Sequence, residues 1–201
     1  MPDKISQAIH FITDAFDGIT RKSSKQPAVF HSLEAGSIVT TMTDDKDVIV
    51  AALLHDTIED TGVSVSDIEK NFGKRVTELV LSETEDKRSD LPPQETWKLR
   101  KIKSINLLQA TNDIGVKMVF LGDKLSNMRG LYWEYKKRGA DLWNDFNQKD
   151  PDAHHWYYRT IADALCELKD FSAWKEYDYL IKQLFKNDNR EKKDEGSIGT
   201  I

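Results

Sequence analysis

The segment VIVAALLHDTIED, residues 48–60, carries the strongest structural signal in the chain. Side chains of the same character, apolar and then polar, recur in it at intervals of three and four residues, the period of an α-helix. We therefore expect one helix from about residue 44 to residue 60. Two neighbouring stripes share one broad face of that helix: Val48, Ala52, His55 and Glu59 form the first, and Ile49, Leu53, Asp56 and Asp60 the second. The first half of this face is apolar and is predicted to be buried.

The second half of the same face is charged. It places an imidazole and three carboxylates at the end of a buried stripe, where they are costly to desolvate. A solvated helix end would explain these groups without a ligand. A cation would also explain them, because the adjacent His55 and Asp56 can reach one ion. Glu59 and Asp60 follow one turn later and are placed to handle a water molecule or a substrate proton.

Two other predicted helices supply further candidate ligands. Asp123 lies on the inward face of a strongly apolar helix expected over residues 114–138, and a buried aspartate is usually paired with a base or bound to a metal. Lys124 or Arg129 could be that base. His31 lies on the apolar stripe of an earlier helix, where a lone histidine is more often a hydrogen-bonded core residue than a ligand.

Taken together, the four side chains indicate a metal site. His31, His55, Asp56 and Asp123 would bring two imidazoles and two carboxylates from three helices to one point. Nitrogen and oxygen ligands without sulfur suit manganese, iron or zinc. A site with spare coordination positions can also hold water and a phosphate oxygen.

Helical periodicity extends over most of the remaining chain. Helices are expected over about residues 5–16, 29–42, 66–72, 76–83, 94–110, 114–138, 152–169 and 172–186, with Ser66 and Glu69 as a capping box for the third of these. No internal repeat, glycine-rich phosphate loop or convincing alternating strand is present in the sequence. We therefore predict an all-α fold, a single helical bundle of about nine to ten helices over residues 1–186. Residues 187–201 are charged and poor in large apolar groups, which predicts a disordered tail.

Composition narrows the class of protein. The 201 residues are 39% hydrophobic and 31% charged, enough to bury a core, which excludes global disorder. The net charge of −5 provides no basic footprint for nucleic acid, so we expect a small-molecule partner held by local cations or a metal. The single cysteine, Cys166, excludes an internal disulfide framework. With no signal-type or membrane-length apolar segment, a cytoplasmic protein is expected.

The order His31, His55-Asp56, Asp123 resembles the H…HD…D pattern of the HD phosphohydrolase superfamily. Neighbouring segments resemble a narrower group, the RelA/SpoT-type alarmone hydrolases, over about residues 4–131. These segments are residues 48–61, Phe72-Gly73, Thr84-Glu85-Asp86-Lys87, Leu121 to Arg129, and the pair Arg21-Lys22. Because the chain stops where synthetase and regulatory domains follow in the long enzymes, it looks like a stand-alone small alarmone hydrolase.

The resemblance implies manganese-dependent removal of the 3′-pyrophosphate from guanosine tetra- or pentaphosphate, which gives GDP or GTP and pyrophosphate. It also implies roles for individual residues: His31, His55, Asp56 and Asp123 hold the ion, Glu59 and Asp60 position and activate water, Arg21 and Lys22 meet the nucleotide, and Asn127 meets the sugar-phosphate region.

The chain departs from the family pattern at several positions. Ser32 stands where proline is common, Gly122 where alanine usually precedes the aspartate, and Gly130 where a larger residue is usual near the ribose. Two alternatives therefore stay open. One is an HD phosphohydrolase acting on another phosphorylated nucleotide, such as an adenine alarmone or NADPH. The other is a catalytically inactive HD protein that serves as a binding or antitoxin partner, although all six metal and acid–base candidates are present.

Overall fold

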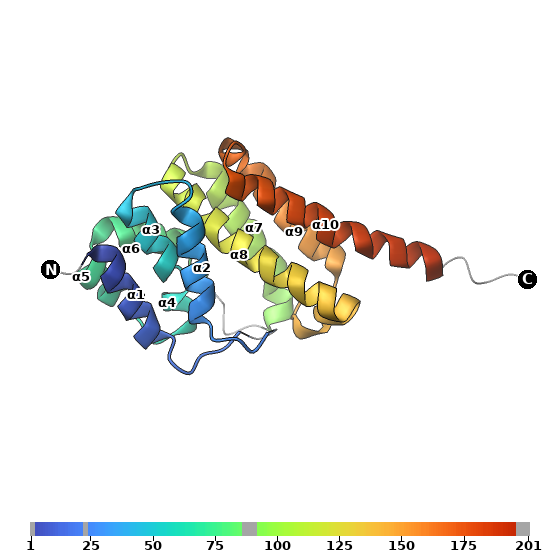
Figure 1. The fold of residues 1–201 in the computed structure, drawn as a ribbon, viewed down its shortest axis with the longest axis horizontal. Helices are drawn as coiled ribbons and strands as arrows, with labels where there is room; N and C mark the ends of the chain where they lie inside the picture. Colours follow the sequence, from blue (N-terminus) through green and yellow to red (C-terminus); the bar gives the residue numbers. More distant parts are fainter. Residues whose placement is uncertain (1–2, 22–23, 86–91, 196–201) are drawn as a thin grey trace, which may run out of the picture.

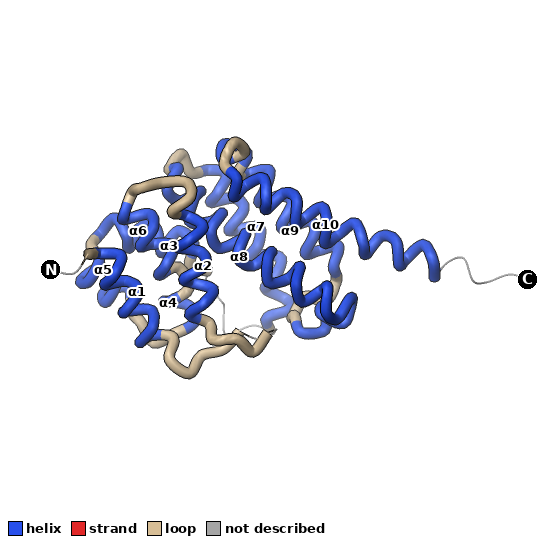
Figure 2. Tube along the Cα trace, viewed as in Figure 1, coloured by secondary structure: helices blue, strands red, loops and turns tan. Residues whose placement is uncertain are grey.

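A computed structural model describes residues 3–21, 24–85 and 92–195, with side chains up to residue 186. Regular structure in these ranges is helical, apart from one isolated bridge between Thr20 and Pro27 (Figure 2). The helices are α1 (Lys4–Ala15), α2 (Val29–Val39), α3 (Lys46–Leu54), α4 (Thr57–Asp60), α5 (Val65–Phe72), α6 (Lys74–Glu83), α7 (Pro93–Ala110), α8 (Ile114–Arg138), α9 (Pro151–Ala164) and α10 (Ser172–Glu195). The predicted all-α bundle of about nine to ten helices is confirmed.

Helix α8 is the central element of the bundle. Figure 1 shows it between α2 and α3 on the N-terminal side and α9 and α10 on the other. Residues 115–126 of this helix are all buried, and most of them are apolar. Buried apolar residues of α8 include Val116, Val119, Phe120, Leu121, Leu125 and Met128. Asp123 and Lys124 are polar residues buried in the same stretch.

The prediction of a single helix from residue 44 to residue 60 is wrong. Helix α3 ends at Leu54, and the short helix α4 begins at Thr57. Two side chains bond to carbonyl groups of the preceding turn: His55 Nδ1 donates to the Ala52 carbonyl at 2.9 Å, and Thr57 Oγ1 donates to the Leu54 carbonyl at 2.6 Å. These side-chain bonds satisfy carbonyls that a continuing helix would otherwise use. The chain consequently turns at the His-Asp pair.

Two other helix boundaries differ from expectation. The capping box of α5 is formed by Ser64 and Asp67, not by Ser66 and Glu69. Helix α10 continues to Glu195, past the expected end near residue 186, and the residues that extend it are mostly Lys, Arg, Glu and Asp, of which the first three are good helix formers. The domain boundary at 186 and the disordered tail stay predictions.

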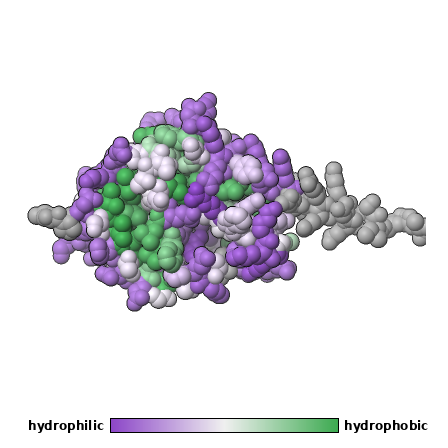
Figure 3. Space-filling view, in the orientation of Figure 1, coloured by the Kyte–Doolittle hydropathy of each residue, from purple (hydrophilic) through white to green (hydrophobic). Residues whose placement is uncertain are grey.

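The surface is mixed in character. In the view of Figure 3, hydrophobic residues gather on the part of the face that lies over α1 and α2, and hydrophilic residues predominate elsewhere. Within the described ranges, each helix is too short or too polar to cross a lipid bilayer.

A close approach of α2 and α8 depends on Gly122. A Cβ atom at this position would lie 2.8 Å from Val39 Cγ2 and 2.9 Å from the Ala35 carbonyl oxygen, so backbone would have to move. Such overpacking costs about 1–3 kcal/mol, more than the roughly 1 kcal/mol that alanine gains over glycine in a helix. We therefore expect Gly122→Ala to lower the free energy of unfolding by about 1 kcal/mol, measured by urea denaturation.

The matched control is Gly130→Ala in the same helix. A Cβ at Gly130 meets no atom within 4 Å, so this variant should be as stable as the parent or more so. Equal behaviour of the two variants would show that the helix crossing does not depend on the absent side chain.

Candidate metal centre and adjoining cavity

Four side chains from three segments of the chain converge at the centre of the bundle. His31 Nε2 on α2 lies 3.1 Å from His55 Nε2 and 3.0 Å from Asp123 Oδ1 on α8. Asp56 Oδ2 lies 3.4 Å from His31 Nε2 and 3.2 Å from His55 Nε2. Both imidazoles and the Asp123 carboxylate are buried, whereas the Asp56 side chain is 23% exposed and marks the side open to solvent.

The hydrogen bonds of the two imidazoles define which nitrogen faces inward. His55 Nδ1 bonds to a carbonyl oxygen of Ala52, which can only accept, so Nδ1 carries the hydrogen. His31 Nδ1 bonds to Ser126 Oγ at 2.8 Å, and that hydroxyl donates to Glu34 Oε2 at 2.6 Å. Ser126 Oγ must then accept from His31. Because Nδ1 carries a hydrogen on both rings, Nε2 is the nitrogen through which each imidazole faces the other and the two carboxylates.

Each imidazole Nε2 lies 3.0–3.5 Å from the other Nε2 and from one oxygen of each carboxylate, and acids gathered in this way need a positive charge among them. The pKa shifts have the same cause. Burial would lower the pKa of His55, but Asp56 and Asp123 raise it well above its usual range. Burial would raise the pKa of Asp56, but the two imidazoles hold it well below its usual range. Imidazoles and carboxylates without sulfur fit a divalent transition metal, and one donor atom each of His31, His55 and Asp123 lies within 4.8 Å of the others, close enough to hold one ion. Asp56 as a fourth ligand stays a prediction.

A buried cation supports Asp123 from behind. Lys124 Nζ contacts Asp123 Oδ2 and donates to Glu83 Oε1 at 2.5 Å. Burial would lower the pKa of Lys124, but the two carboxylates hold it well above its usual range. The other oxygen of Glu83, Oε2, is buried without a hydrogen-bond partner, and burial raises the pKa of this carboxyl well above its usual range. Lys124 thus compensates two buried acids at once.

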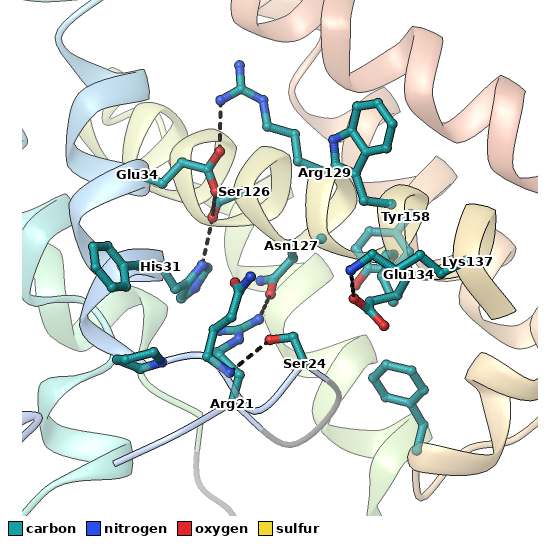
Figure 4. A pocket seen from close by; sticks show the side chains of 17 residues that line it. Arg21, Ser24, His31, Glu34, Ser126, Asn127, Arg129, Glu134, Lys137 and Tyr158 are labelled. Atoms are coloured by element: carbon teal, nitrogen blue, oxygen red, sulfur yellow. Dashed lines mark hydrogen bonds and ion pairs between the residues drawn. The ribbon is translucent and has the colours of Figure 1, made fainter. Parts of the chain in front are cut away.

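A cavity of about 300 Å³ has His31 in its wall, the one of the four donors that lines it. Its lining combines aromatic rings and cations, as a nucleotide site requires. The aromatic residues are Phe30, Trp133, Phe146 and Tyr158, and the cations are Arg21, Arg129 and Lys137 (Figure 4). Burial raises the pKa of Tyr158 to about 12, so its hydroxyl stays protonated at neutral pH.

A family model described as HD domain matches residues 8–150, more than half of the chain and a range that includes all four convergent side chains. The chain belongs to the HD-domain family.

Curated relatives narrow the position of this HD domain within the family. GTP pyrophosphokinase rsh of Brucella abortus is 37% identical over 114 residues, which are 57% of this chain and 15% of the relative. The bifunctional (p)ppGpp synthase/hydrolase SpoT of Escherichia coli is 36% identical over 131 residues, which are 64% of this chain and 18% of the relative. The chain thus spans less than one fifth of the length of these relatives, and the resemblance to RelA/SpoT-type proteins is confirmed.

Two solved structures share the fold of this HD domain over most of its length. A metazoan ortholog of SpoT that hydrolyzes ppGpp superposes with a TM-score of 0.72 at 27% identity, covering 91% of this chain and 97% of that chain. The crystal structure of lmo0812 from Listeria monocytogenes superposes with a TM-score of 0.67 at 30% identity, covering 78% of this chain and 99% of that chain.

The residues with predicted catalytic roles lie next to the metal centre in the chain. Glu59 and Asp60 belong to α4, the short helix that follows the His-Asp pair. Glu59 is half-buried and its Oε1 accepts the backbone N–H of Glu85 at 2.5 Å, whereas Asp60 is exposed. Their assignment as acid–base residues stays a prediction.

Of the three residues with predicted substrate roles, two lie in the wall of the cavity. Arg21 lines the cavity and donates through Nη2 to Asn127 Oδ1 at 2.5 Å (Figure 4). Asn127 also lines the cavity and contacts Asp123 through its side-chain amide. The two residues therefore connect the cavity to a metal-ligand candidate, and their binding roles stay predictions. Lys22 lies outside the described residues.

Two cations of α7, Arg100 and Lys101, hold the segment that contacts Glu59. Arg100 Nη1 and Lys101 Nζ each donate to the carboxylate of Glu85 at 2.7 Å. Glu85 is the residue whose backbone N–H bonds to Glu59, so these two cations hold the segment that orients Glu59. This arrangement assigns Arg100 and Lys101 an internal contact.

Three polar residues of the site were missed in the sequence: Glu34, Glu83 and Ser126. Each follows an apolar or metal-ligand position by three or four residues on a helix, and so shares its face: Glu34 follows His31, Glu83 follows Leu79 and Val80, and Ser126 follows Asp123. Polar side chains on a buried face were the available signal. By contrast Arg129, considered as a partner of Asp123, instead pairs with Glu34 and Glu176.

Proposed function

We propose that this HD domain is a metal-dependent pyrophosphohydrolase that removes the 3′-pyrophosphate of guanosine tetra- or pentaphosphate. The products would be GDP or GTP and pyrophosphate. The observation that carries the proposal is the convergence of two inward-facing imidazoles and two carboxylates. One of these imidazoles, His31, also lines a cavity that has cations and aromatic rings in its wall. The metazoan ortholog that hydrolyzes ppGpp, nearly all of which this chain covers, supports the choice of substrate.

His31, His55, Asp56 and Asp123 would hold the metal, with manganese as the proposed ion. A divalent cation bound there would act as a Lewis acid toward water and a phosphate oxygen. Cytoplasmic location stays part of the proposal.

The chain's own side chains would perform the remaining tasks. Glu59, held by the Glu85 N–H, would accept a proton from the attacking water. The bond between phosphorus and the ribose 3′-oxygen would break, and the 3′-oxygen would leave with the proton that Glu59 took from water, passed on through the exposed Asp60. Arg21 would neutralise phosphate charge, and Asn127, bonded to both Arg21 and Asp123, would keep that cation next to the metal ligands.

The decisive experiment is a product screen with purified protein. We expect pyrophosphate release from guanosine tetraphosphate with Mn²⁺, and none when a chelator replaces the metal. Glu59→Gln should retain Mn²⁺ binding and lose at least about 100-fold in kcat, the usual contribution of a positioned base. Glu78→Gln, an exposed residue of α6, is the matched control and should behave as the parent.

The same screen separates the alternatives. Turnover of an adenine 3′-pyrophosphate or of NADPH, with guanosine tetraphosphate left intact, would favour an HD phosphohydrolase of different base preference. Metal binding without turnover of any nucleotide would contradict the enzymatic proposal and favour a binding protein.

A further inference from the structure

A series of side-chain contacts leads away from the candidate metal centre through His31. The ring nitrogen Nδ1 of His31 lies 2.8 Å from Ser126 Oγ, and Ser126 Oγ lies 2.6 Å from Glu34 Oε2. The second oxygen of that carboxylate accepts Nη1 of Arg129 at 3.0 Å. Figure 4 shows the whole series, with Glu34 reaching from α2 to Ser126 and Arg129 on α8. All of these contacts are made within the protein and do not depend on a bound substrate.

The direction of each hydrogen bond follows from chemistry. A carboxylate only accepts, so the single hydrogen of the Ser126 hydroxyl goes to Glu34. The hydroxyl oxygen is then available to His31 only as an acceptor, and Nδ1 must carry the imidazole hydrogen. Without Glu34, the hydroxyl could donate to Nδ1 instead. The imidazole hydrogen would then sit on Nε2, directed at His55 and Asp123, where a metal ligand needs a lone pair.

The carboxylate that sets this direction is itself held from two sides. Arg129 donates through Nε and Nη2 to both oxygens of Glu176 on α10, at 2.7 Å each. The same guanidinium donates through Nη1 to Glu34. These groups are about one third exposed, so the ion pairs add little stability. Their planar geometry fixes orientation, which is the property that the series requires.

We propose that Ser126 and Glu34 are positioning residues that hold His31 in the tautomer with a free Nε2 lone pair. Arg129, anchored by Glu176, keeps Glu34 in place. The inference rests on the metal centre of the proposed function and is independent of which nucleotide is the substrate. Partners of this kind typically change metal affinity by about 10- to 100-fold when they are removed.

The first test measures Mn²⁺ affinity, from the signal of free Mn²⁺ in electron paramagnetic resonance titrations. Ser126→Ala and Glu34→Leu should each raise the dissociation constant by about 10-fold or more. Glu34→Gln keeps an amide oxygen that can accept the Ser126 hydroxyl, so it should stay within about threefold of the parent. Glu78→Leu on α6 and Ser82→Ala, whose hydroxyl bonds only within its own helix, are matched controls and should leave the constant unchanged.

The second test reads the tautomer directly, from the nitrogen-15 shifts of His31 in the metal-free protein. We expect Nδ1 of His31 to carry a hydrogen throughout the population in the parent and in Glu34→Gln, and in only part of the population in Glu34→Leu. A merely structural role would lower the melting temperature of the variants without moving either readout.

Two results would overturn the inference: a Mn²⁺ dissociation constant of Ser126→Ala within twofold of the parent, or an unchanged tautomer in Glu34→Leu. A parent protein that binds neither Mn²⁺ nor Zn²⁺ would also overturn it. A parent that binds Mn²⁺ but releases no pyrophosphate would contradict the proposed function alone, because neither readout here depends on turnover.

Discussion

Asp123→Ala is expected to lower pyrophosphate release at least about 1,000-fold and to abolish measurable Mn²⁺ binding at micromolar metal. Asp123 Oδ1 lies within 3.5 Å of both Nε2 atoms and is the only ligand candidate that α8 contributes. A metal contributes several kcal/mol of charge stabilisation in a transition state, and a 1,000-fold loss corresponds to about 4 kcal/mol. Steady-state kinetics with guanosine tetraphosphate and a Mn²⁺ titration measure the two effects.

The variant should remain folded. Lys124 keeps its pairing with Glu83 after Asp123 is shortened, so no buried cation is left alone. Circular dichroism should therefore show an unchanged helical spectrum. Asp141→Ala, at an exposed position outside the site, is the control and should retain full turnover. Turnover of Asp123→Ala within tenfold of the parent would remove Asp123 from the metal centre and contradict the proposed mechanism.

Lys124→Met is expected to destabilise the metal-free protein by about 3–5 kcal/mol, the usual effect of removing one partner of a buried ionic group. Methionine is similar in length, so the loss comes from charge. Without Lys124, the carboxylates of Glu83 and Asp123 face each other in the core with no cation between them. Urea denaturation in the presence of a chelator measures the change in the free energy of unfolding.

A pH series and a double variant test the cause of that loss. With Lys124 gone, both carboxyls would have a higher pKa in the folded than in the unfolded protein. The folded state would then bind more protons, so stability should rise as the pH falls from 7 toward 5. Adding Glu83→Gln to Lys124→Met should also restore part of the loss. Lys175→Met on the surface of α10 is the control, with an effect within about 0.5 kcal/mol. A double variant no more stable than Lys124→Met would show that packing, not charge, explains the effect.

The sequence predicted the fold class and the four side chains that the structure brings close together, because both depend on local patterns. Each of the four ligand candidates shares a helix face with apolar residues, or directly follows one, and a three- or four-residue period is enough to show that. The break between α3 and α4 was not predictable in this way. It depends on His55 and Thr57 taking carbonyl partners within one turn, and both residues occur freely inside helices.

Contacts between segments far apart in the chain could not be predicted from the sequence either. Ser126 and Glu34 are 92 residues apart, and only the crossing of α2 over α8 brings them together. Lys124 and Arg129 were equal candidates for the partner of Asp123, because a sequence does not show which side of α8 meets which neighbour. The structure assigns Lys124 to Asp123 and Arg129 to Glu34 and Glu176.

Two of the three cations named in the cavity wall, Arg129 and Lys137, are matched by acids at short range. Arg129 faces Glu34, and Lys137 Nζ lies 2.8 Å from Glu134 Oε1, so their fields largely cancel beyond the Debye length of about 8 Å at physiological salt. The chain as a whole is also negative, with a net charge of −5. A polyanion diffusing toward this opening would receive no long-range electrostatic steering. Its capture would be decided by how long it stays after collision rather than by how fast it arrives.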